Sequence, residues 1–183
     1  AGRLGIGSTT SDRVEGIVDL GNNLVPTQVK MGLKHTCALL DDSSTLGIDG
    51  IVKCWGHDAS GKLGDGNSSL SDIGDEANEV SNSNREINFG GNYKALTITS
   101  GRNHTCAILD DTSTNVIEGD VKCWGKNDQG QLGYNTTSPM GDNETVASLS
   151  KVNLGTNLKA IAIESSYDTT CAILDDTTTN EEE

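Results

Sequence analysis

Apolar residues in this chain fall into short runs, and glycine, asparagine and aspartate separate one run from the next. The runs at 24–31, 93–99 and 158–163 each follow a turn of the form [LF]-G-x-N. Short runs rich in β-branched residues and bounded by turn residues are typical of strands, and we find no helical periodicity of useful length. The pattern therefore predicts an all-β protein.

The runs recur in a fixed order at a constant spacing. H-T-C-A-[LI]-L-D-D is followed by V-K-C-W-G and then by G-[KQ]-L-G, and this series is written twice, 69 positions apart, as from Cys37 to Cys106. A third series opens with T-T-C-A-I-L-D-D at 169–176. A repeat this long is typical of a multi-stranded unit that buries its apolar face only by stacking on further copies.

The repeat divides the chain into four parts. Residues 1–32 match the tail of one unit plus the first strand of the next, 33–100 and 101–163 are full units, and 164–183 match the head of another. We expect a chain cut out of phase with its repeat, and we expect the polar inserts at 65–86 and 134–150 to be surface loops.

The ordered motifs resemble the repeat of the regulator of chromosome condensation family, in the cysteine-bearing variant found in secreted or surface proteins. In that family each repeat supplies strands to a blade of a β-propeller. The resemblance implies an all-β chain of propeller-type blades, with tandem repeats of about 69 residues that form an incomplete ring within this chain. One departure is Thr169, which stands where the other two units have His35 and His104.

A partial ring leaves strand edges and blade faces exposed, and such surfaces favour aggregation unless they are covered. We expect them to be covered by further repeats of the same chain or by other copies of the protein. Head-to-tail pairing of copies would give a ring if the rotation closes and a filament if it does not.

Four of the five cysteines fall into two pairs, Cys37 with Cys54 and Cys106 with Cys123, each 17 positions apart. In a hairpin that sets Cys37 opposite Cys54, the two Cα atoms come within disulfide reach. Each bridge would stabilise the fold by about 3 kcal/mol in the chain-entropy model. Cys171 is expected to be unpaired or intermolecular. Disulfides favour an extracellular or cell-surface location, whereas reduced, buried cysteines would indicate the cytosol.

Other side chains admit a structural and a chemical interpretation. His35 lies near two cysteines, but no fourth zinc ligand is nearby, so we expect a half-buried histidine bonded within its blade. The paired aspartates at 41–42, 110–111 and 175–176 raise the question of calcium, yet they lack the spacing of a calcium loop and suit turns. Trp55 and Trp124 are expected to pack between blades. We expect neither a metal nor any other cofactor.

The chain carries 13 basic and 27 acidic residues, a net charge of −14. Binding to nucleic acid or to an anionic membrane requires clustered Lys and Arg, so this balance excludes both partners. No stretch has the roughly 20 apolar residues of a membrane span.

The sequence contains no recognisable catalytic motif and only candidate sites of glycosylation. No nucleophile elbow, zinc-protease, P-loop or dinucleotide motif occurs, so we do not expect an enzyme. Asn-x-Ser/Thr sequons occur at Asn67, Asn103, Asn135 and Asn143, which are candidate glycosylation sites, with Asn103 the weakest because it adjoins a core strand.

Two functions fit these observations. The first is a secreted structural or surface-assembly protein, with a head-to-tail polymer or fibre as the form that such assembly would take. The alternative is a propeller that acts as a platform for protein recognition, as a segment of a longer repeat protein. Oligomeric state distinguishes the two hypotheses, because only the first requires association of copies.

Overall fold

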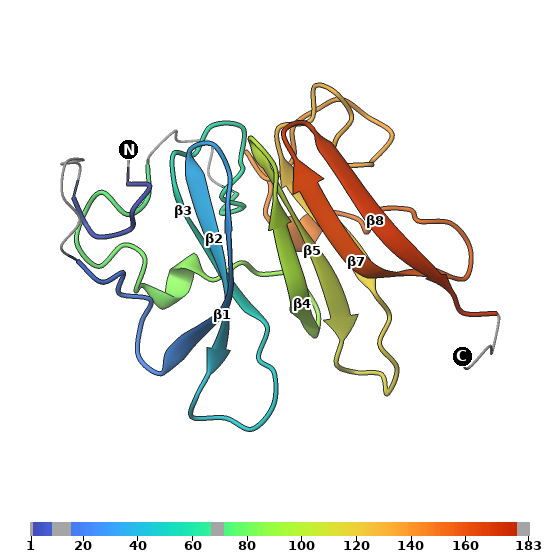
Figure 1. The fold of residues 1–183 in the computed structure, drawn as a ribbon, viewed down its shortest axis with the longest axis horizontal. Helices are drawn as coiled ribbons and strands as arrows, with labels where there is room; N and C mark the ends of the chain where they lie inside the picture. Colours follow the sequence, from blue (N-terminus) through green and yellow to red (C-terminus); the bar gives the residue numbers. More distant parts are fainter. Residues whose placement is uncertain (1, 9–15, 67–71, 179–183) are drawn as a thin grey trace.

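The computed structural model describes residues 2–8, 16–66 and 72–178, and within them three antiparallel sheets follow one another (Figure 1). Blade 1 contains β1, β2 and β3, blade 2 contains β4, β5 and β6, and blade 3 contains β7 and β8. The strand bounds are β1 Leu24–Met31, β2 His35–Asp42, β3 Ile51–Gly56, β4 Tyr93–Ser100, β5 His104–Asp111, β6 Asp120–Gly125, β7 Leu158–Ser166 and β8 Thr169–Asp176. The all-β prediction is confirmed.

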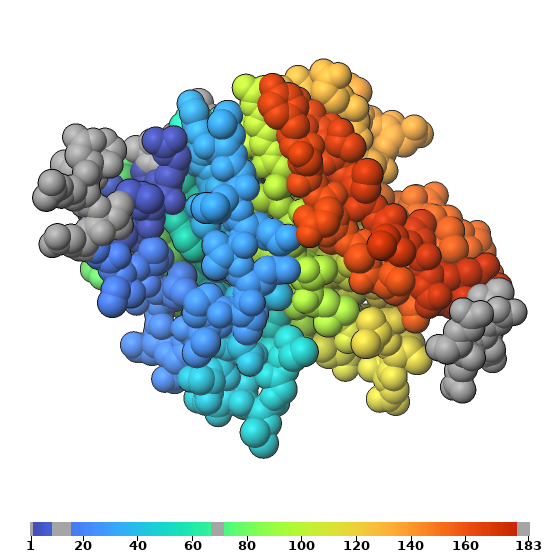
Figure 2. Space-filling model, in the orientation of Figure 1, coloured from blue at the N-terminus to red at the C-terminus, as the bar shows by residue number. Residues whose placement is uncertain are grey.

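The sheets stand side by side as blades of an open propeller, and they do not close into a barrel (Figure 1). Strand β4 contacts β1 and β2, and β7 contacts β4 and β5, so the first strand of each blade packs on the blade before it. Blades 1 and 3 also meet, as the space-filling view shows (Figure 2), where Nζ of Lys30 lies 2.9 Å from the Glu164 carboxylate. The incomplete propeller expected from the repeat is therefore what the chain forms.

The hairpins repeat the same register in each blade. Cys37 lies opposite Cys54 and Leu39 opposite Val52, as the motif spacing predicts. The pairing of the first two strands shifts by one residue between Pro26 and Gln28, and the same irregularity recurs in blades 2 and 3. Such bulges increase strand twist. The division of the chain at residues 33, 101 and 164 stays a prediction, because a tandem repeat can be divided at any of its strands.

The core consists of apolar layers between successive blades. One cluster joins blade 1 to blade 2 and includes Leu40, Leu109 and Trp124, whose side chains are almost fully buried. A smaller cluster joins blade 2 to blade 3 through Ile108 and Ile163. Burial of apolar area at these faces stabilises the stack, and neither face exists in an isolated blade.

The polar inserts differ from the surface loops that we expected. Ile73, Val80 and Val146 are buried, and Ile73 pairs with Gly56 in an isolated bridge beside β3. Two short 3-10 helices, η1 Ser83–Arg85 and η2 Val146–Ser148, lie within the inserts. Single apolar residues hold these segments against the outer strands. Because these residues are isolated in polar sequence, no strand pattern in the sequence predicts their burial.

Candidate functional site

The tight turns between the first and second strands lie together at one end of the three blades (Figure 1). Leu33, Arg102 and Tyr167 occupy the same place in the three turns. The Leu33 N–H donates to the Arg102 carbonyl at 3.0 Å, and the Arg102 N–H donates to the Tyr167 carbonyl at 2.7 Å. Backbone hydrogen bonds thus join the turns into one continuous rim, which we call the turn surface and define as residues 31–34, 100–103 and 165–168.

The turn surface exposes large side chains. Met31 is 75% exposed, Leu33 52% and Tyr167 63%, and the Arg102 guanidinium lies 4.6 Å from the centre of the Tyr167 ring. With the neighbouring serines they border a hollow of about 430 Å³. Tyr, Arg and Met are enriched at the centres of protein interfaces, and Tyr and Arg are frequent hot spots. Because the same fold position holds three different residues, the fold alone does not dictate them.

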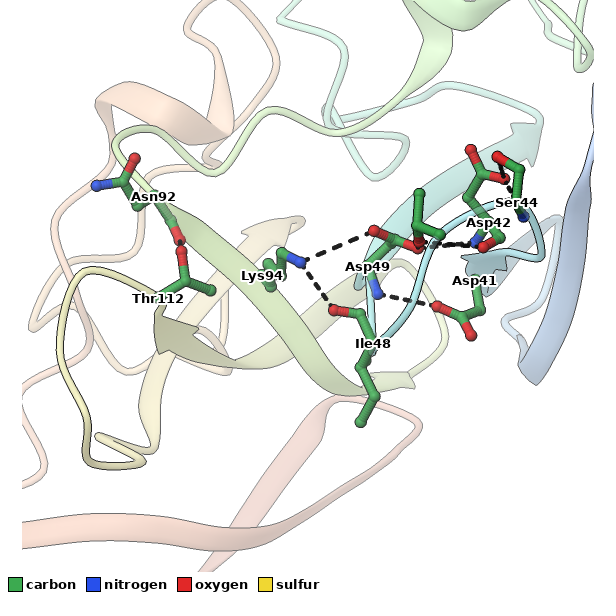
Figure 3. Close-up of polar contacts among 9 residues, drawn as sticks. Asp41, Asp42, Ser44, Ile48, Asp49, Asn92, Lys94 and Thr112 are labelled. Carbon is green, nitrogen blue, oxygen red and sulfur yellow. Dashed lines mark hydrogen bonds and ion pairs between the residues drawn. The ribbon is translucent and has the colours of Figure 1, made fainter.

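The opposite end of the blades carries the acidic loops, and their carboxylates are used in the turns themselves (Figure 3). The Ser44 N–H donates to Oδ1 of Asp42 at 2.8 Å, and the Asp42 N–H donates to Oδ2 of Asp49 at 3.0 Å. Lys94, from blade 2, donates to the Ile48 carbonyl at 2.9 Å and lies 3.8 Å from the Asp49 carboxylate. Hydrogen bonds from Thr45 and from the Asp42 backbone hold the pKa of Asp49 below its usual value.

The same turn chemistry recurs at Asp111, which accepts from the Ser113 N–H at 2.9 Å. Among the residues that the structure describes, no group of three or more His, Cys, Asp or Glu is arranged to hold a metal ion. The calcium interpretation therefore gains no support from these loops, and their geometry is that of Asp-stabilised turns.

His35 and His104 differ from the half-buried, within-blade histidines that we expected. Both are almost fully buried, and each bonds to the next blade: His35 Nε2 lies 3.0 Å from Thr105 Oγ1, and His104 Nε2 lies 2.8 Å from Thr170 Oγ1. Desolvation by burial lowers the pKa of His35 to about 3, with smaller contributions from Lys62 and His104. Burial likewise lowers the pKa of His104. Each histidine is therefore neutral near pH 7 and links its blade to the next through a hydrogen bond.

The cysteines fall where the sequence places them. The sulfur atoms of Cys37 and Cys54 lie 2.11 Å apart, and those of Cys106 and Cys123 lie 2.13 Å apart, so both pairs are at disulfide distance. Cys171 occupies the equivalent position on β8, where it is exposed and free. The oxidation of both cysteine pairs to disulfides in the protein remains a prediction.

The candidate glycosylation sites differ in exposure. Asn135 and Asn143 are exposed, whereas Asn103 is half-buried and its Oδ1 accepts from Lys62 Nζ at 3.5 Å. Asn67 lies outside the described residues. Glycan attachment stays a prediction at all four positions.

Sequence reasoning missed the role of the lysine in V-K-C-W-G. Nζ of Lys53 lies within hydrogen-bond distance of four backbone carbonyls, among them Leu20 at 2.8 Å. Nζ of Lys122 donates to three backbone carbonyls, among them Phe89 at 2.9 Å. Both side chains are buried, and burial lowers the pKa of each ammonium group. A buried lysine satisfies carbonyls that no strand pairs, and its recurrence in both motifs was the signal available in the sequence.

The tryptophans are buried, and each lies under a glycine of the G-x-L-G segment that precedes its blade. Cβ atoms added at Gly5 and Gly64 would each lie 2.8 Å from Nε1 of Trp55 and Trp124, respectively. Trp55 Nε1 also donates to the Arg3 carbonyl at 3.2 Å. The segments thus seal one blade onto the next, in agreement with the packing role that we expected for the tryptophans.

Comparison with known proteins finds similarity both in sequence and in fold. No family model matches the chain. The ultraviolet-B receptor UVR8 of Arabidopsis thaliana is 26% identical over 132 residues, which are 72% of this chain and 24% of UVR8. UVR8 is an RCC1-like repeat protein, where RCC1 denotes regulator of chromosome condensation.

Two solved structures share the fold. Human WBSCR16 has a TM-score of 0.59 at 18% identity, and Prp20p of Saccharomyces cerevisiae, the yeast regulator of chromosome condensation, has a TM-score of 0.60 at 14% identity. The chain aligns over 94% of its length with each and spans 37% of either. The chain thus spans about a quarter of UVR8 and somewhat over a third of WBSCR16 and of Prp20p. Within the described residues, no helix is long and apolar enough to cross a membrane.

Proposed function

Since this chain is built of propeller repeats of the regulator of chromosome condensation type, we propose that it serves as a protein-recognition platform whose turn surface contacts the partner. The observation that carries the proposal is the break in repeat symmetry at Leu33, Arg102 and Tyr167. Equivalent positions that serve folding hold similar residues, as the buried cysteines, tryptophans and lysines do. These three positions differ, and Leu33 and Tyr167 are exposed while Arg102 is half-buried.

The energetics suit an anchor of this kind. The Arg102 guanidinium already lies on the Tyr167 ring, and backbone hydrogen bonds fix both residues, so little side-chain freedom remains to be lost on binding. A partner that covers the rim would exclude water from a Tyr–Arg pair flanked by Met31 and Leu33. Such a partly preorganised aromatic centre is typical of interface hot spots.

The net charge of the chain limits the class of partner that it can bind. The net charge of −14 repels nucleic acid and other acidic macromolecules, so the partner is a protein with a neutral or basic face. Among the relatives, the structure of Prp20p is described together with its binding properties to Gsp1p and histones. That statement concerns Prp20p, and we propose only the general mode, protein binding by a propeller, for this chain.

We further propose that the module works outside the cell or at its surface. Two cysteine pairs at disulfide distance support this location, because such bridges persist in oxidising compartments. The proposal assigns the turn surface a binding role and no catalytic one.

The test compares two ends of the same molecule. A photo-crosslinking residue is placed at position 167 on the turn surface or at position 117 on an acidic loop, where Ile117 is similarly exposed at 61%. A protein crosslinked at position 167 is then purified, and its affinity is measured for the wild type, Tyr167→Ala and Ile117→Ala. We expect Tyr167→Ala to weaken binding at least tenfold and Ile117→Ala to have no effect. Equal crosslinking at both positions, or equal affinities of the two variants, would refute the turn surface as the site.

A secreted structural assembly is the second candidate, and the open edge of β8 is the observation that favours it. Sedimentation analysis over a wide concentration range tests it. A polymer that grows with concentration would replace the recognition proposal, whereas a monomer at all concentrations would exclude assembly of this chain by itself.

A further inference from the structure

The hollow in the turn surface combines positive charge with apolar walls. It has a volume of about 430 Å³, and residues from the turns of all three blades border it. Its walls include the exposed side chains of Met31 and Leu33 together with Arg102. Asp168 is the one carboxylate of the turn surface, and it does not line the hollow. A chain with a net charge of −14 thus forms a hollow that is bordered by a cation and by none of its acidic residues.

The two cations of the turn surface have no acidic partner. Lys34 is exposed and Arg102 is half-buried, and neither forms an ion pair with any residue that the structure describes. Most cations elsewhere are paired with carboxylates, namely Lys30, Arg85, Lys94, Lys126, Lys151 and Lys159. Because 27 acidic residues are available in the chain, two neighbouring cations without a carboxylate favour an anionic group that a partner brings.

Arg102 is fixed in position while most of its donors stay free. Its guanidinium lies 4.6 Å from the centre of the Tyr167 ring, and Nη1 donates to the Tyr167 hydroxyl. A guanidinium carries five N–H donors in a planar fork, and Tyr167 is the acceptor found for them within the described ranges. The remaining donors can bind both oxygens of one carboxylate through two parallel hydrogen bonds. Because the ring already holds the guanidinium, little side-chain freedom is lost on binding.

A hydroxyl group in the wall of the hollow also lacks a partner. Ser100 lines the hollow, and its Oγ is shielded from solvent without a hydrogen bond to any described group. A buried hydroxyl without a partner is unfavourable, and a carboxylate oxygen beside Arg102 would accept from it after a rotation about the Cα–Cβ bond. Arg102 and Ser100 therefore call for the same kind of group, which is an anionic acceptor.

We propose that the hollow binds the C-terminal residue of the partner chain, an assignment that rests on the proposed function of the turn surface. The terminal carboxylate pairs with the free donors of Arg102, and the last side chain, which is aliphatic, packs against Met31 and Leu33. The volume of the hollow lies in the range of pockets that hold small ligands, so a chain end fits there. Capture of a terminal carboxylate is a recurring mode of peptide recognition.

The net charge of the chain favours a chain end over an acidic side chain. A face rich in aspartate and glutamate would be repelled by a protein of charge −14. Every protein has a terminal carboxylate whatever its net charge, so a neutral or basic partner can still present one anion to Arg102. A single anion next to an aliphatic side chain is also what the hollow, with one cation and two apolar walls, is able to bind.

The test titrates three acetylated tripeptides into the isotope-labelled 183-residue chain and follows its backbone amides by NMR. The first is Ala-Ala-Leu with a free carboxylate, and the second is the same peptide with a C-terminal amide. The third is Ala-Glu-Leu with a C-terminal amide, which has the charge of the first but no terminal carboxylate. We expect the first peptide to bind at least tenfold more tightly than the other two, with the largest shifts at residues 33, 102 and 167.

Three protein variants locate the binding groups. Arg102→Gln should remove the preference for the free carboxylate, and Leu33→Ser should weaken binding of the first peptide severalfold. Arg85→Gln, which removes a cation paired with Asp65 in the insert after blade 1, should leave the preference unchanged. Amide spectra that match the wild type away from the turn surface show that each variant is folded.

The peptides decide the proposal without any variant. Equal affinities of the first and second peptides would overturn it, because the carboxylate would then contribute nothing. Equal affinities of the first and third would overturn it too, since a side-chain carboxylate would serve as well. Binding of none of them at millimolar concentration would show that the hollow does not take a chain end.

Failure of the proposed function has a different signature. If no protein crosslinks at position 167, the turn surface is not a recognition site, whatever the peptides show. If a crosslinked partner binds equally tightly after removal of its C-terminal residue, the turn surface remains the site and the assignment of the chain end to the hollow is wrong.

Discussion

At the residue scale, two positions of the turns differ together between the blades: blades 1 and 2 have a glycine and a histidine there, and blade 3 has neither. A Cβ added at Gly32 would lie 2.1 Å from Cε1 of His35, and one at Gly101 would lie 2.1 Å from Cε1 of His104. Blade 3 has Ser166 in place of the glycine and Thr169 in place of the histidine. The smaller threonine leaves room for a side chain where the imidazole does not. Glycine is therefore required here by contact with a side chain, since neither Gly32 nor Gly101 has a positive φ.

This pairing predicts a rescue. Gly101→Ser alone should destabilise the protein by about 1–3 kcal/mol, because it overpacks a buried site. Adding His104→Thr should recover most of that loss, since the double variant reproduces the turn of blade 3. Urea denaturation of the wild type, both single variants and the double variant measures the coupling. Strictly additive losses would contradict the explanation.

The residue scale is also where sequence reasoning succeeded and failed most clearly. The pairing of Cys37 with Cys54 was predictable, because it follows from strand register and a fixed loop length. The bond from His35 to Thr105 was not, because it joins residues 70 positions apart whose proximity depends on how blades stack. The exposed Tyr167 carried no signal, since a single aromatic in a turn looks the same whether or not it binds.

At the element scale, each complete blade combines a hairpin with a cross-strand cysteine pair. The pair joins the middle strand to the outer strand, and the buried lysine of the outer strand holds the insert that follows or precedes it. Few apolar residues are needed for such a sheet, which explains how a chain that is only 33% hydrophobic builds a core. The buried anchors Ile73 and Val146 were missed because they are isolated in polar sequence.

Removal of one cysteine pair should therefore be costly. Replacing Cys106 and Cys123 together by Ala should lower the free energy of unfolding by about 3 kcal/mol, because the unfolded chain regains the freedom of a closed loop. Cys171→Ala, at an equivalent position without a partner, should change it little. Chemical denaturation under non-reducing conditions provides the measurement, and peptide mapping confirms the pairing. Equal stabilities of the two variants would show that the bridges are not formed.

At the scale of the whole molecule, the blades are joined by contacts that repeat from one interface to the next. The Ala95 N–H donates to the Gly50 carbonyl at 3.2 Å, and the Ala160 N–H donates to the Gly119 carbonyl at 2.9 Å. A neutral histidine bridges each interface as well. The repeat period made this stacking predictable, whereas the contact of Lys30 with Glu164 depends on the curvature of the stack and has no trace in the sequence.

The histidine joints predict that acid weakens the stack. The pKa of His35 is about 3 in the folded protein and near 6.5 in the unfolded chain, so the unfolded state binds more protons between these values. Stability from this residue is complete above pH 6.5 and falls as the pH drops, by about 2 kcal/mol at pH 5. Asp58 acts in the opposite direction, because burial raises its pKa to about 6.

A variant isolates the histidine contribution from that of Asp58. His35→Gln should lose less stability than the wild type between pH 7 and pH 5, and urea denaturation at the two values gives the difference. Parallel pH profiles for the two proteins would show that His35 is not the responsible group.

The repeated interface also has a mechanical consequence. If the chain is pulled from its two ends, both junctions between blades resist through a similar set of hydrogen bonds, and the junction of blade 2 with blade 3 has the smaller apolar cluster. Blade 3, which packs on blade 2 through the smaller cluster, should detach first, and the hairpins with paired cysteines should then release in discrete steps of limited extension. A force-spectroscopy trace would record this as a short series of evenly sized peaks, and reducing agent would lengthen the spacing between them.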